Sequence, residues 1–128
     1  MDYPTKIKSL GKNGYTKTSS TTIKADINVK TLQAALNKSY NCKLDIDGLY
    51  GPKTKKVIKK NYLKKGKKNE HVKVVQTFLK GLGYGITVDG SYGPATEKVV
   101  KQFQRDTGLT QDGYTGPDTH LKIINGLK

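Results

Sequence analysis

The sequence predicts an all-α fold in which small three-helix bundles are duplicated in tandem after a flexible or weakly structured N-terminal segment. Three observations predict this fold. A turn signature with the frame D-G-x-(Y/T)-G-P-x-T occurs at residues 47–54, 89–96 and 112–119. The stretch VKTLQAALN (29–37) aligns with VKVVQTFLK (72–80) at an offset of 43 residues, while the first two turns are 42 residues apart. Within these stretches apolar residues recur at a spacing of three and then four residues, which is the helical period.

The first predicted helix covers residues 28–39. Its apolar positions recur at helical spacing, at Val29, Leu32 and Leu36. Either Asp26 or Asn28 can cap its start. Gln33 lies beside the apolar stripe, where its amide needs a partner, most often a neighbouring backbone group and less often a ligand.

The first turn signature predicts the start of a second helix, over residues 52–65. Asp-Gly favours a tight turn with positive φ, the following aromatic can fold beneath it, and Gly-Pro opens a helix with proline at its first position. We expect the Thr two residues after the proline to return a hydrogen bond to open backbone N–H groups. The buried face of this helix is predicted to contain Val57, Ile58 and Tyr62.

The third predicted helix covers residues 70–82 and repeats the first. Asn69 is its predicted N-cap, and Gly81 and Gly83 break it. Its apolar stripe consists of Val72, Val75, Leu79 and Leu82. Gln76 takes the place of Gln33.

The second and third turn signatures start the last two predicted helices, over residues 94–107 and 116–126. The residues expected to bury the first of these helices are Val99, Val100 and Phe103. The buried face of the helix over residues 116–126 is expected to contain Leu121, Ile124 and Leu127.

The repeats divide the chain into three predicted parts. These are a Lys-, Thr- and Ser-rich linker or N-terminal extension (1–25), a partial repeat (26–66) and a complete repeat (67–128). We expect the partial repeat to be stabilised by docking on its neighbour. Because LGKNGYT (10–16) is similar to LTQDGYT (109–115), the extension is also a candidate for a worn third element.

The formal net charge of +14 is concentrated in the first half of the chain. Residues 1–65 hold 15 Lys and 4 acids, a balance of +11, whereas residues 66–128 hold 9 Lys and Arg and 6 acids, a balance of +3. Such a charge attracts polyanions, whether nucleic acid, an anionic membrane or an acidic wall polymer. Arg105 is the sole arginine. Since arginine is the side chain that reads guanine and grips phosphate at two points, the composition disfavours nucleic acid.

The sequence has no readable membrane or export signal. No apolar run reaches the roughly 18 residues of a membrane span, and the basic N-terminus lacks the apolar middle region of a signal peptide. We therefore expect no membrane insertion, and a chain made in the cytoplasm. The single cysteine, Cys42, cannot form an intrachain disulfide and is most simply a small buried apolar residue.

The titratable residues do not form a pattern that is typical of catalysis. His71 and His120 are each isolated in the sequence, whereas a zinc hydrolase needs two or three ligands at metal-binding spacing. The three turn aspartates are explained by the turns that they make, not as the paired carboxylates of a glycosidase. We therefore predict no catalytic residue, no metal and no cofactor. A catalyst built on Cys42 and one of the histidines is an alternative.

The order of these elements carries a family resemblance. The succession V-x-x-(V/L)-Q-x-x-L, D-G-x-Y-G-P-x-T, V-V-x-x-F-Q-x-x-x-G-L and D-G-x-x-G-P-x-T resembles the small helical peptidoglycan-binding domain of bacterial and phage cell-wall lytic enzymes. Residues 70–126 match throughout, including the Phe103-Gln104 pair. Residues 27–66 match about two-thirds of the pattern, because Asn61-Tyr62 replaces Phe-Gln and the terminal turn is missing.

The resemblance implies a non-catalytic targeting module that holds a lytic enzyme, such as a phage endolysin or an autolysin, on the peptidoglycan of a Gram-positive wall. The catalytic domain would lie on the same or a separate chain, and the ligand groove near the turns that start the helices. The lysine charge adds the hypothesis of retention on anionic wall polymers such as teichoic acids. A basic helical nucleic-acid-binding protein is the alternative function, supported by charge alone.

Candidate ligand-binding residues gather at these turns, where open backbone N–H groups and Arg105 can receive a carboxylate. Tyr50 and Tyr92 share one frame position, at which the ring can plug the turn or contact a sugar. Tyr84 and Tyr114 lie in predicted loops, where we expect more exposure. The full set of candidates is Tyr50, Tyr84, Asp89, Tyr92, Gly93, Thr96, Gln104, Arg105 and Tyr114.

Overall fold

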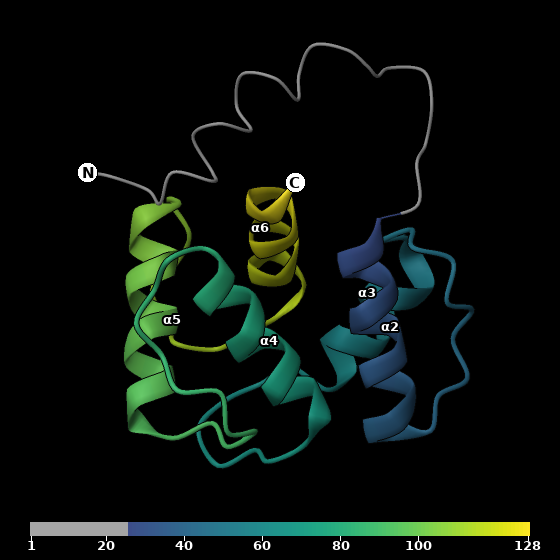
Figure 1. The fold of residues 1–128 in the computed structure, drawn as a ribbon, viewed down its shortest axis with the longest axis horizontal. Coiled ribbons are helices and arrows are strands. Elements are labelled where there is room, and N and C mark those ends of the chain that lie inside the picture. Colours follow the sequence, from purple (N-terminus) through teal and green to yellow (C-terminus); the bar gives the residue numbers. More distant parts are fainter. Residues whose placement is uncertain (1–25) are drawn as a thin grey trace, which may run out of the picture.

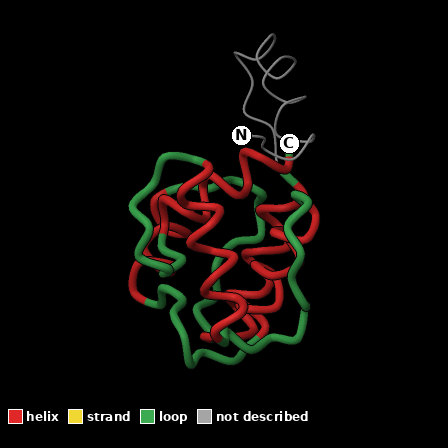
Figure 2. Tube along the Cα trace, turned by 90° about the vertical axis from the view of Figure 1, so that its left-hand side faces the viewer, coloured by secondary structure: helices red, strands yellow, loops and turns green. Residues whose placement is uncertain are grey.

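The computed structural model describes residues 26–128, which fold into five helices and contain no β-strand (Figures 1 and 2). The helices are α2 (Ile27–Tyr40), α3 (Pro52–Lys60), α4 (Glu70–Gly81), α5 (Pro94–Asp106) and α6 (Pro117–Leu127). This confirms the all-α prediction. The predicted N-terminal extension (1–25), with its LGKNGYT segment, lies outside the described residues. No helix in the described part is long and apolar enough to cross a lipid bilayer.

The helices start where the sequence predicts, by two different devices. In α2 the Asp26 carboxylate accepts a hydrogen bond from the Asn28 N–H at 2.7 Å. In α4 the Asn69 side chain accepts one from the Val72 N–H at 2.9 Å. The other three helices each begin with proline after a glycine N-cap that has no side chain to offer. Their first turns therefore keep open backbone N–H groups.

Helix α3 is shorter than predicted, since it ends at Lys60 and not at residue 65. After the helix, Leu63 forms an antiparallel backbone bridge with Thr115. The Leu63 nitrogen lies 3.1 Å from the Thr115 carbonyl oxygen, and the Thr115 nitrogen lies 2.8 Å from the Leu63 carbonyl oxygen. A second bridge joins Lys68 and Ser91. These tertiary bonds compensate for the helical bonds that are given up, and they bury the Leu63 side chain completely.

Both repeats share one hydrophobic core. Helix α4 lies in the middle of the molecule and packs on α2 and on α6 (Figure 1). The apolar stripe of α2, at Val29, Leu32 and Leu36, joins the same buried cluster as the α4 stripe and Phe103 of α5. The partial repeat therefore docks on the complete one, as the repeat pattern predicts.

Two details of the predicted core are wrong. Tyr62 lies beyond the end of α3 and is 37% exposed, because the bridge at Leu63 turns that segment outward. In α6 the buried face contains Ile123 as well as Ile124, while Leu121 is only half-buried.

The two histidines are not isolated, which corrects the sequence-based expectation. Nε2 of His71 and Nε2 of His120 are 2.8 Å apart in the core, although the residues are far apart in the sequence. His71 Nδ1 lies 2.8 Å from the Tyr40 hydroxyl, which accepts from the Asn69 side chain at 3.3 Å. His120 Nδ1 lies 2.8 Å from the Gly116 carbonyl oxygen.

The Gly116 carbonyl oxygen, at the end of this series of hydrogen bonds, fixes the tautomers of the neutral His71 and His120 rings. Because the Gly116 oxygen can only accept, His120 carries its proton on Nδ1 and accepts at Nε2. His71 then donates from Nε2 and accepts the Tyr40 hydroxyl proton at Nδ1. One directed hydrogen-bond chain thus ties α2 and α4 to the start of α6.

Candidate functional site

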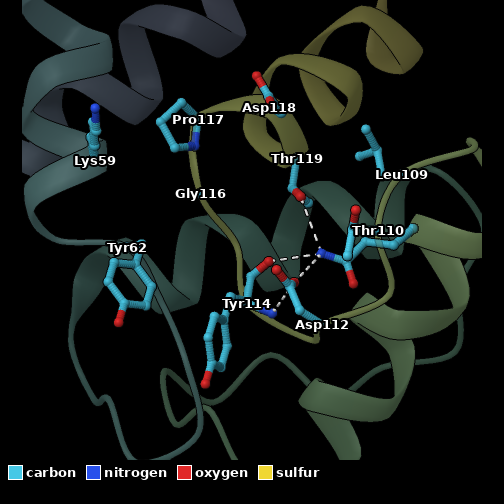
Figure 3. A pocket seen from close by; sticks show the side chains of 11 residues that line it. Lys59, Tyr62, Leu109, Thr110, Asp112, Tyr114, Gly116, Pro117, Asp118 and Thr119 are labelled. Carbon is cyan, nitrogen blue, oxygen red and sulfur yellow. Dashed lines mark hydrogen bonds between the residues drawn. The ribbon is translucent and has the colours of Figure 1, made fainter.

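Each turn signature is locked to the helix before it by a buried glutamine. In the third turn, Gln104 Nε2 lies 3.0 Å from the Asp112 carboxylate, 2.8 Å from the Tyr114 carbonyl and 3.2 Å from the Thr119 hydroxyl (Figure 3). Its Oε1 accepts from the Gly113 N–H at 3.0 Å. We call this arrangement a glutamine clamp.

The same clamp occurs at the other two turns. Gln33 binds Asp47, Leu49 and Thr54 in the first turn. Gln76 binds Asp89, Ser91 and Thr96 in the second. All three glutamines are buried, and the amide of Gln104 is engaged in the third turn on both its nitrogen and its oxygen.

The clamp corrects the predicted role of the turn threonines. Thr96 was expected to cap the helix, but α5 has no side-chain cap and the Thr96 hydroxyl accepts from Gln76 at 3.0 Å. Thr54 and Thr119 have the same role. The first-turn N–H groups of these helices are therefore left for another acceptor.

The turn aspartates act as predicted. The carboxylates of Asp47, Asp89 and Asp112 each accept from the backbone N–H two residues later, at 2.9–3.0 Å. The glycine after each aspartate has a φ of 77–79°, which favours glycine. The backbone N–H of Leu49 or Ser91, followed by the glutamine amide, lowers the pKa of Asp47 and Asp89, so both are charged at neutral pH.

A pocket of about 500 Å³ opens beside the third turn (Figure 3). One wall comes from the partial repeat, through Lys59 of α3 and Tyr62. The rest comes from the third turn and the first residues of α6, including Leu109, Asp112, Tyr114, Gly116, Pro117 and Asp118. We call it the third-turn pocket. It lies at the junction of the two repeats.

Two exposed tyrosines give this pocket an aromatic surface. The Tyr62 and Tyr114 rings have centroids 5.4 Å apart and planes tilted by 41°. They are 37% and 43% exposed, while Lys64 Nζ lies 5.7 Å from the Tyr62 ring centre. Such rings can stack on a sugar face and hydrogen-bond through their hydroxyls.

The start of α6 supplies polar groups to the pocket. Gly116 is its N-cap and provides no side-chain acceptor, so the N–H groups of Asp118 and Thr119 have no partner within the helix. An anionic or carbonyl oxygen is the natural acceptor at such a helix start. The Asp118 carboxylate and the Lys59 ammonium add one charge of each sign.

The partial repeat also holds this helix start in place. The Tyr50 hydroxyl donates to the Pro117 carbonyl oxygen at 2.8 Å, and Leu63 bridges Thr115. Burial, together with the nearby Asp118 carboxylate, raises the pKa of Tyr50 above its usual value. Tyr50 therefore acts here as a neutral donor between the repeats.

The candidate tyrosines separate by exposure. Tyr114 lies in the third-turn pocket. Tyr92 is 1% exposed and donates to the Gly113 carbonyl at 2.6 Å, so it plugs its turn. The prediction that Tyr84 is exposed is wrong, because it is 8% exposed and its hydroxyl donates to Asp106 at 2.7 Å. The loop around it folds back on α5, where its ring packs edge-on against Phe103.

The remaining candidates do not line the third-turn pocket. Asp89, Gly93 and Thr96 belong to the second turn. Arg105 is mostly exposed, and its Nε lies 3.9 Å from Asp106.

The helix start after Gly116 was among the expected carboxylate sites, whereas the pocket residues that were not predicted are Lys59, Tyr62, Leu109, Thr110, Asp112, Pro117, Asp118 and Thr119. The third turn signature, at residues 112–119, was a sequence signal for the pocket residues that lie within it. No signal indicated Lys59 and Tyr62 as pocket residues, because only the tertiary fold brings them to this turn.

The cysteine and both histidines of the described residues have hydrogen-bond partners within the fold. No group of three or more His, Cys, Asp or Glu residues there could hold a metal ion. Cys42 is half-buried against the core, and its thiol donates to Asn37 at 3.3 Å. Both histidine rings are engaged in the core chain described above.

Comparison with known proteins identifies the family. The family model of a peptidoglycan binding domain matches residues 68–123. The SleB N-terminal domain is 32% identical, with a TM-score of 0.51, over 52% of this chain and 93% of that one. No match was found among curated proteins.

Two longer proteins are also similar over part of their length. A peptidoglycan-binding protein from Clostridioides difficile is 39% identical over 48% of this chain and 39% of that one, with a TM-score of 0.48. A fused Zn-dependent amidase/peptidase/peptidoglycan-binding domain-containing protein from Clostridium acetobutylicum is 34% identical over 48% of this chain and 28% of that one, also with a TM-score of 0.48. The match to the family model and the near-complete coverage of the SleB domain lead to one conclusion: the chain belongs to the peptidoglycan-binding domain family.

Proposed function

We propose that this chain is a non-catalytic module that binds peptidoglycan in the third-turn pocket and targets a cell-wall lytic enzyme to the wall. The observation that carries the proposal is the pocket itself. There, the Tyr62 and Tyr114 rings lie beside the open N–H groups at the start of α6. Peptidoglycan offers both partners, since its sugars have apolar faces for the rings and its peptides carry carbonyl and carboxylate oxygens for the N–H groups.

The lytic partner is the finer part of the proposal. The similar SleB unit is by name one domain of a larger protein. We infer that the present module likewise works with a catalytic domain, on the same or a separate chain. An endolysin of a phage or an autolysin of a Gram-positive bacterium fits this arrangement, and the site of action is then the bacterial cell wall.

Anionic wall polymers are proposed as a second partner, on a lysine-rich face. Residues 52–68 contain no acid, and all their lysines except the half-buried Lys67 are exposed. The nine lysines of this segment, Lys67 included, are Lys53, Lys55, Lys56, Lys59, Lys60, Lys64, Lys65, Lys67 and Lys68. None of them takes part in an ion pair with another described residue. A teichoic acid would neutralise this face, with an attraction screened over about 8 Å at physiological salt.

The decisive experiment is co-sedimentation of the chain with teichoic-acid-stripped peptidoglycan sacculi. We compare Gly116→Phe with the matched variant Gly93→Phe. Both glycines are N-caps in extended backbone before a proline, and an added Cβ meets nothing within 4 Å at either position. Only Gly116 lines the third-turn pocket. We expect Gly116→Phe to fill the pocket and abolish sedimentation, and Gly93→Phe to bind like the unsubstituted chain.

Three readouts separate this function from its alternatives. Sedimentation without a fall in turbidity of a cell suspension supports a binder, whereas lysis that disappears in Cys42→Ala would establish a catalyst. A DNA mobility shift without sedimentation would establish the nucleic-acid alternative.

Binding to unstripped walls should weaken as salt rises, while binding to stripped sacculi should persist. Loss of binding in Gly93→Phe alone would move the site to the second turn.

A further inference from the structure

A second pocket, of about 410 Å³, lies beside the first turn, outside the segment that the family model matches. We call it the first-turn pocket. Its lining is equivalent to that of the third-turn pocket position by position. The first-turn pocket is lined by residues 44, 45, 47, 49 and 51–54. The third-turn pocket is lined by the residues 65 positions later in the sequence, 109, 110, 112, 114 and 116–119. The clamp glutamines, Gln33 and Gln104, complete the two linings.

The first-turn pocket has the same cradle. Gln33 holds the turn through Asp47 and Thr54, as Gln104 does in the third turn. Gly51 is an N-cap without a side-chain acceptor, so α3 also presents open first-turn N–H groups. Lys53 lies in that first turn, where α6 has Asp118, and its ammonium favours an anionic oxygen.

A third hollow, of about 560 Å³, shares lining residues with both pockets. It shares Pro52 with the first-turn pocket, and it shares Lys59, Pro117 and Asp118 with the third-turn pocket. Lys55 and Lys56 line this hollow alone. Because neighbouring hollows share lining residues, we treat the three as parts of one groove from the start of α3 to the start of α6.

We infer that this groove binds one extended peptidoglycan fragment along its whole length. On this inference, which rests on the proposed function, the third-turn pocket takes a sugar on its tyrosine rings. The lysine-lined middle faces carboxylates of the stem peptide, and the first-turn pocket takes the next part of the fragment. The partial repeat thus contributes a binding segment of its own.

We expect the two ends of the groove to differ in binding affinity. Leu49 occupies the position of Tyr114, and no second ring corresponds to Tyr62 in the first-turn pocket. The first-turn pocket therefore lacks the stacking surface, and we expect it to add affinity only for a ligand that is already held at the third turn.

Fragment length provides the test. We would measure Kd by titration calorimetry for a disaccharide-tetrapeptide monomer and for its cross-linked dimer, both purified from digested sacculi. We expect one site per chain for each fragment, with roughly tenfold tighter binding of the dimer. The inference is overturned if the two fragments bind equally well, or if two monomers bind each chain.

Two variants of the first turn sharpen this test. Gly51→Phe, at a position where an added Cβ meets nothing within 4 Å, should remove the advantage of the dimer and leave the Kd of the monomer unchanged. Leu49→Tyr, at a residue that is 40% exposed, should increase that advantage. Thermal melting of each variant verifies folding. Unchanged dimer affinity in Gly51→Phe would contradict the inference.

The outcomes distinguish this inference from the proposed function. If neither fragment binds, or if Gly116→Phe has no effect, the proposed function itself fails. If the monomer binds at the third-turn pocket and length adds nothing, only the extended groove fails. Displacement of the dimer by purified teichoic acid, together with equal binding of the two fragments, would assign the lysine-lined hollow to that polymer instead.

Discussion

Gln76 is the residue on which the second turn depends most directly. Its amide binds the backbone and side chains of the turn through five hydrogen bonds, and it is completely buried. Replacing it by leucine would leave the Asp89 and Gly90 N–H groups without their acceptor, and would remove the amide that donates to the Thr96 hydroxyl. We expect Gln76→Leu to lower the free energy of unfolding by roughly 2–4 kcal/mol in urea denaturation.

The matched control for this substitution is Gln102→Leu, on the exposed face of α5. It should change the free energy of unfolding by less than about 0.5 kcal/mol. Equal effects at the two positions would show that the clamp contributes nothing specific.

The buried histidine pair predicts a loss of stability in acid. Burial lowers the pKa of His120 to about 4, even though its hydrogen bond to Gly116 opposes the shift. Burial, followed by the neighbouring His120 and by Lys67, also lowers the pKa of His71. The unfolded chain therefore binds more protons than the folded one below pH 6.5. We expect the free energy of unfolding to fall as pH drops from 6.5 to 4, by about 3 kcal/mol from His120 alone.

Denaturation in urea at pH 7, 5.5 and 4 measures this dependence. The double variant His71→Gln, His120→Gln should be less stable at pH 7 but should lose the slope between pH 6.5 and 4. The depressed pKa values of Asp47 and Asp89 act in a separate window, since their contribution is lost only as pH falls below about 4. An unchanged slope in the double variant would disprove the assignment.

Residue-scale predictions from sequence succeeded where the cause was local. The turn glycines and the caps of α2 and α4 follow from residues next to them. The clamp amides find neighbouring partners, as the burial cost of an amide requires. The histidine pair could not be predicted in this way, because His71 and His120 meet only once α4 and α6 have packed. The burial of Tyr84 has the same kind of cause.

At the scale of the element, the segment after α3 shows a tertiary bond overriding helical propensity. The sequence from residue 61 to 65 contains no proline or glycine, and the local stop signal is limited to Asn61, whose side chain donates to the Val57 carbonyl oxygen at 3.0 Å. The backbone bridge between Leu63 and Thr115 then directs the following residues away from the helix axis. For the other helices, caps and prolines at the ends are local signals, and their bounds follow the prediction closely.

We expect Leu63→Ala to be strongly destabilising, because Leu63 is fully buried at this bridge. The free energy of unfolding should fall by roughly 2–5 kcal/mol in urea denaturation. The control is Ile46→Ala, at an apolar residue that is 50% exposed and should be close to neutral. A small effect of Leu63→Ala would mean that the segment after α3 is held by the backbone bridge to Thr115 and not by the packing of the Leu63 side chain.

At the scale of the whole molecule, the shared core couples the two repeats. Leu36 of α2 is fully buried in the cluster that also contains the α4 stripe and Phe103 of α5. We expect Leu36→Ala to destabilise the complete repeat together with the partial one, by roughly 2–5 kcal/mol. Amide hydrogen exchange measures this, since protection in α5 and α6 should fall along with protection in α2.

The control for this coupling is Lys38→Ala, on the same helix but outside the buried cluster. If α5 and α6 kept their protection in Leu36→Ala, the repeats would be independent folding units. The duplicated sequence predicts that the partial repeat docks on its neighbour, but not which residues make the contact. That contact depends on which apolar faces are left over after each repeat has formed.

The position of the third-turn pocket across the repeat junction has a practical consequence for protein engineering. Cutting the chain at residue 67, where the complete repeat is predicted to begin, would remove Lys59 and Tyr62 from the pocket. It would also remove the Tyr50 hydroxyl that binds the Pro117 carbonyl. On the proposed function, a portable wall-targeting tag should therefore be made from residues 26–128. The shorter tag would keep the family signature and lose a wall of the pocket.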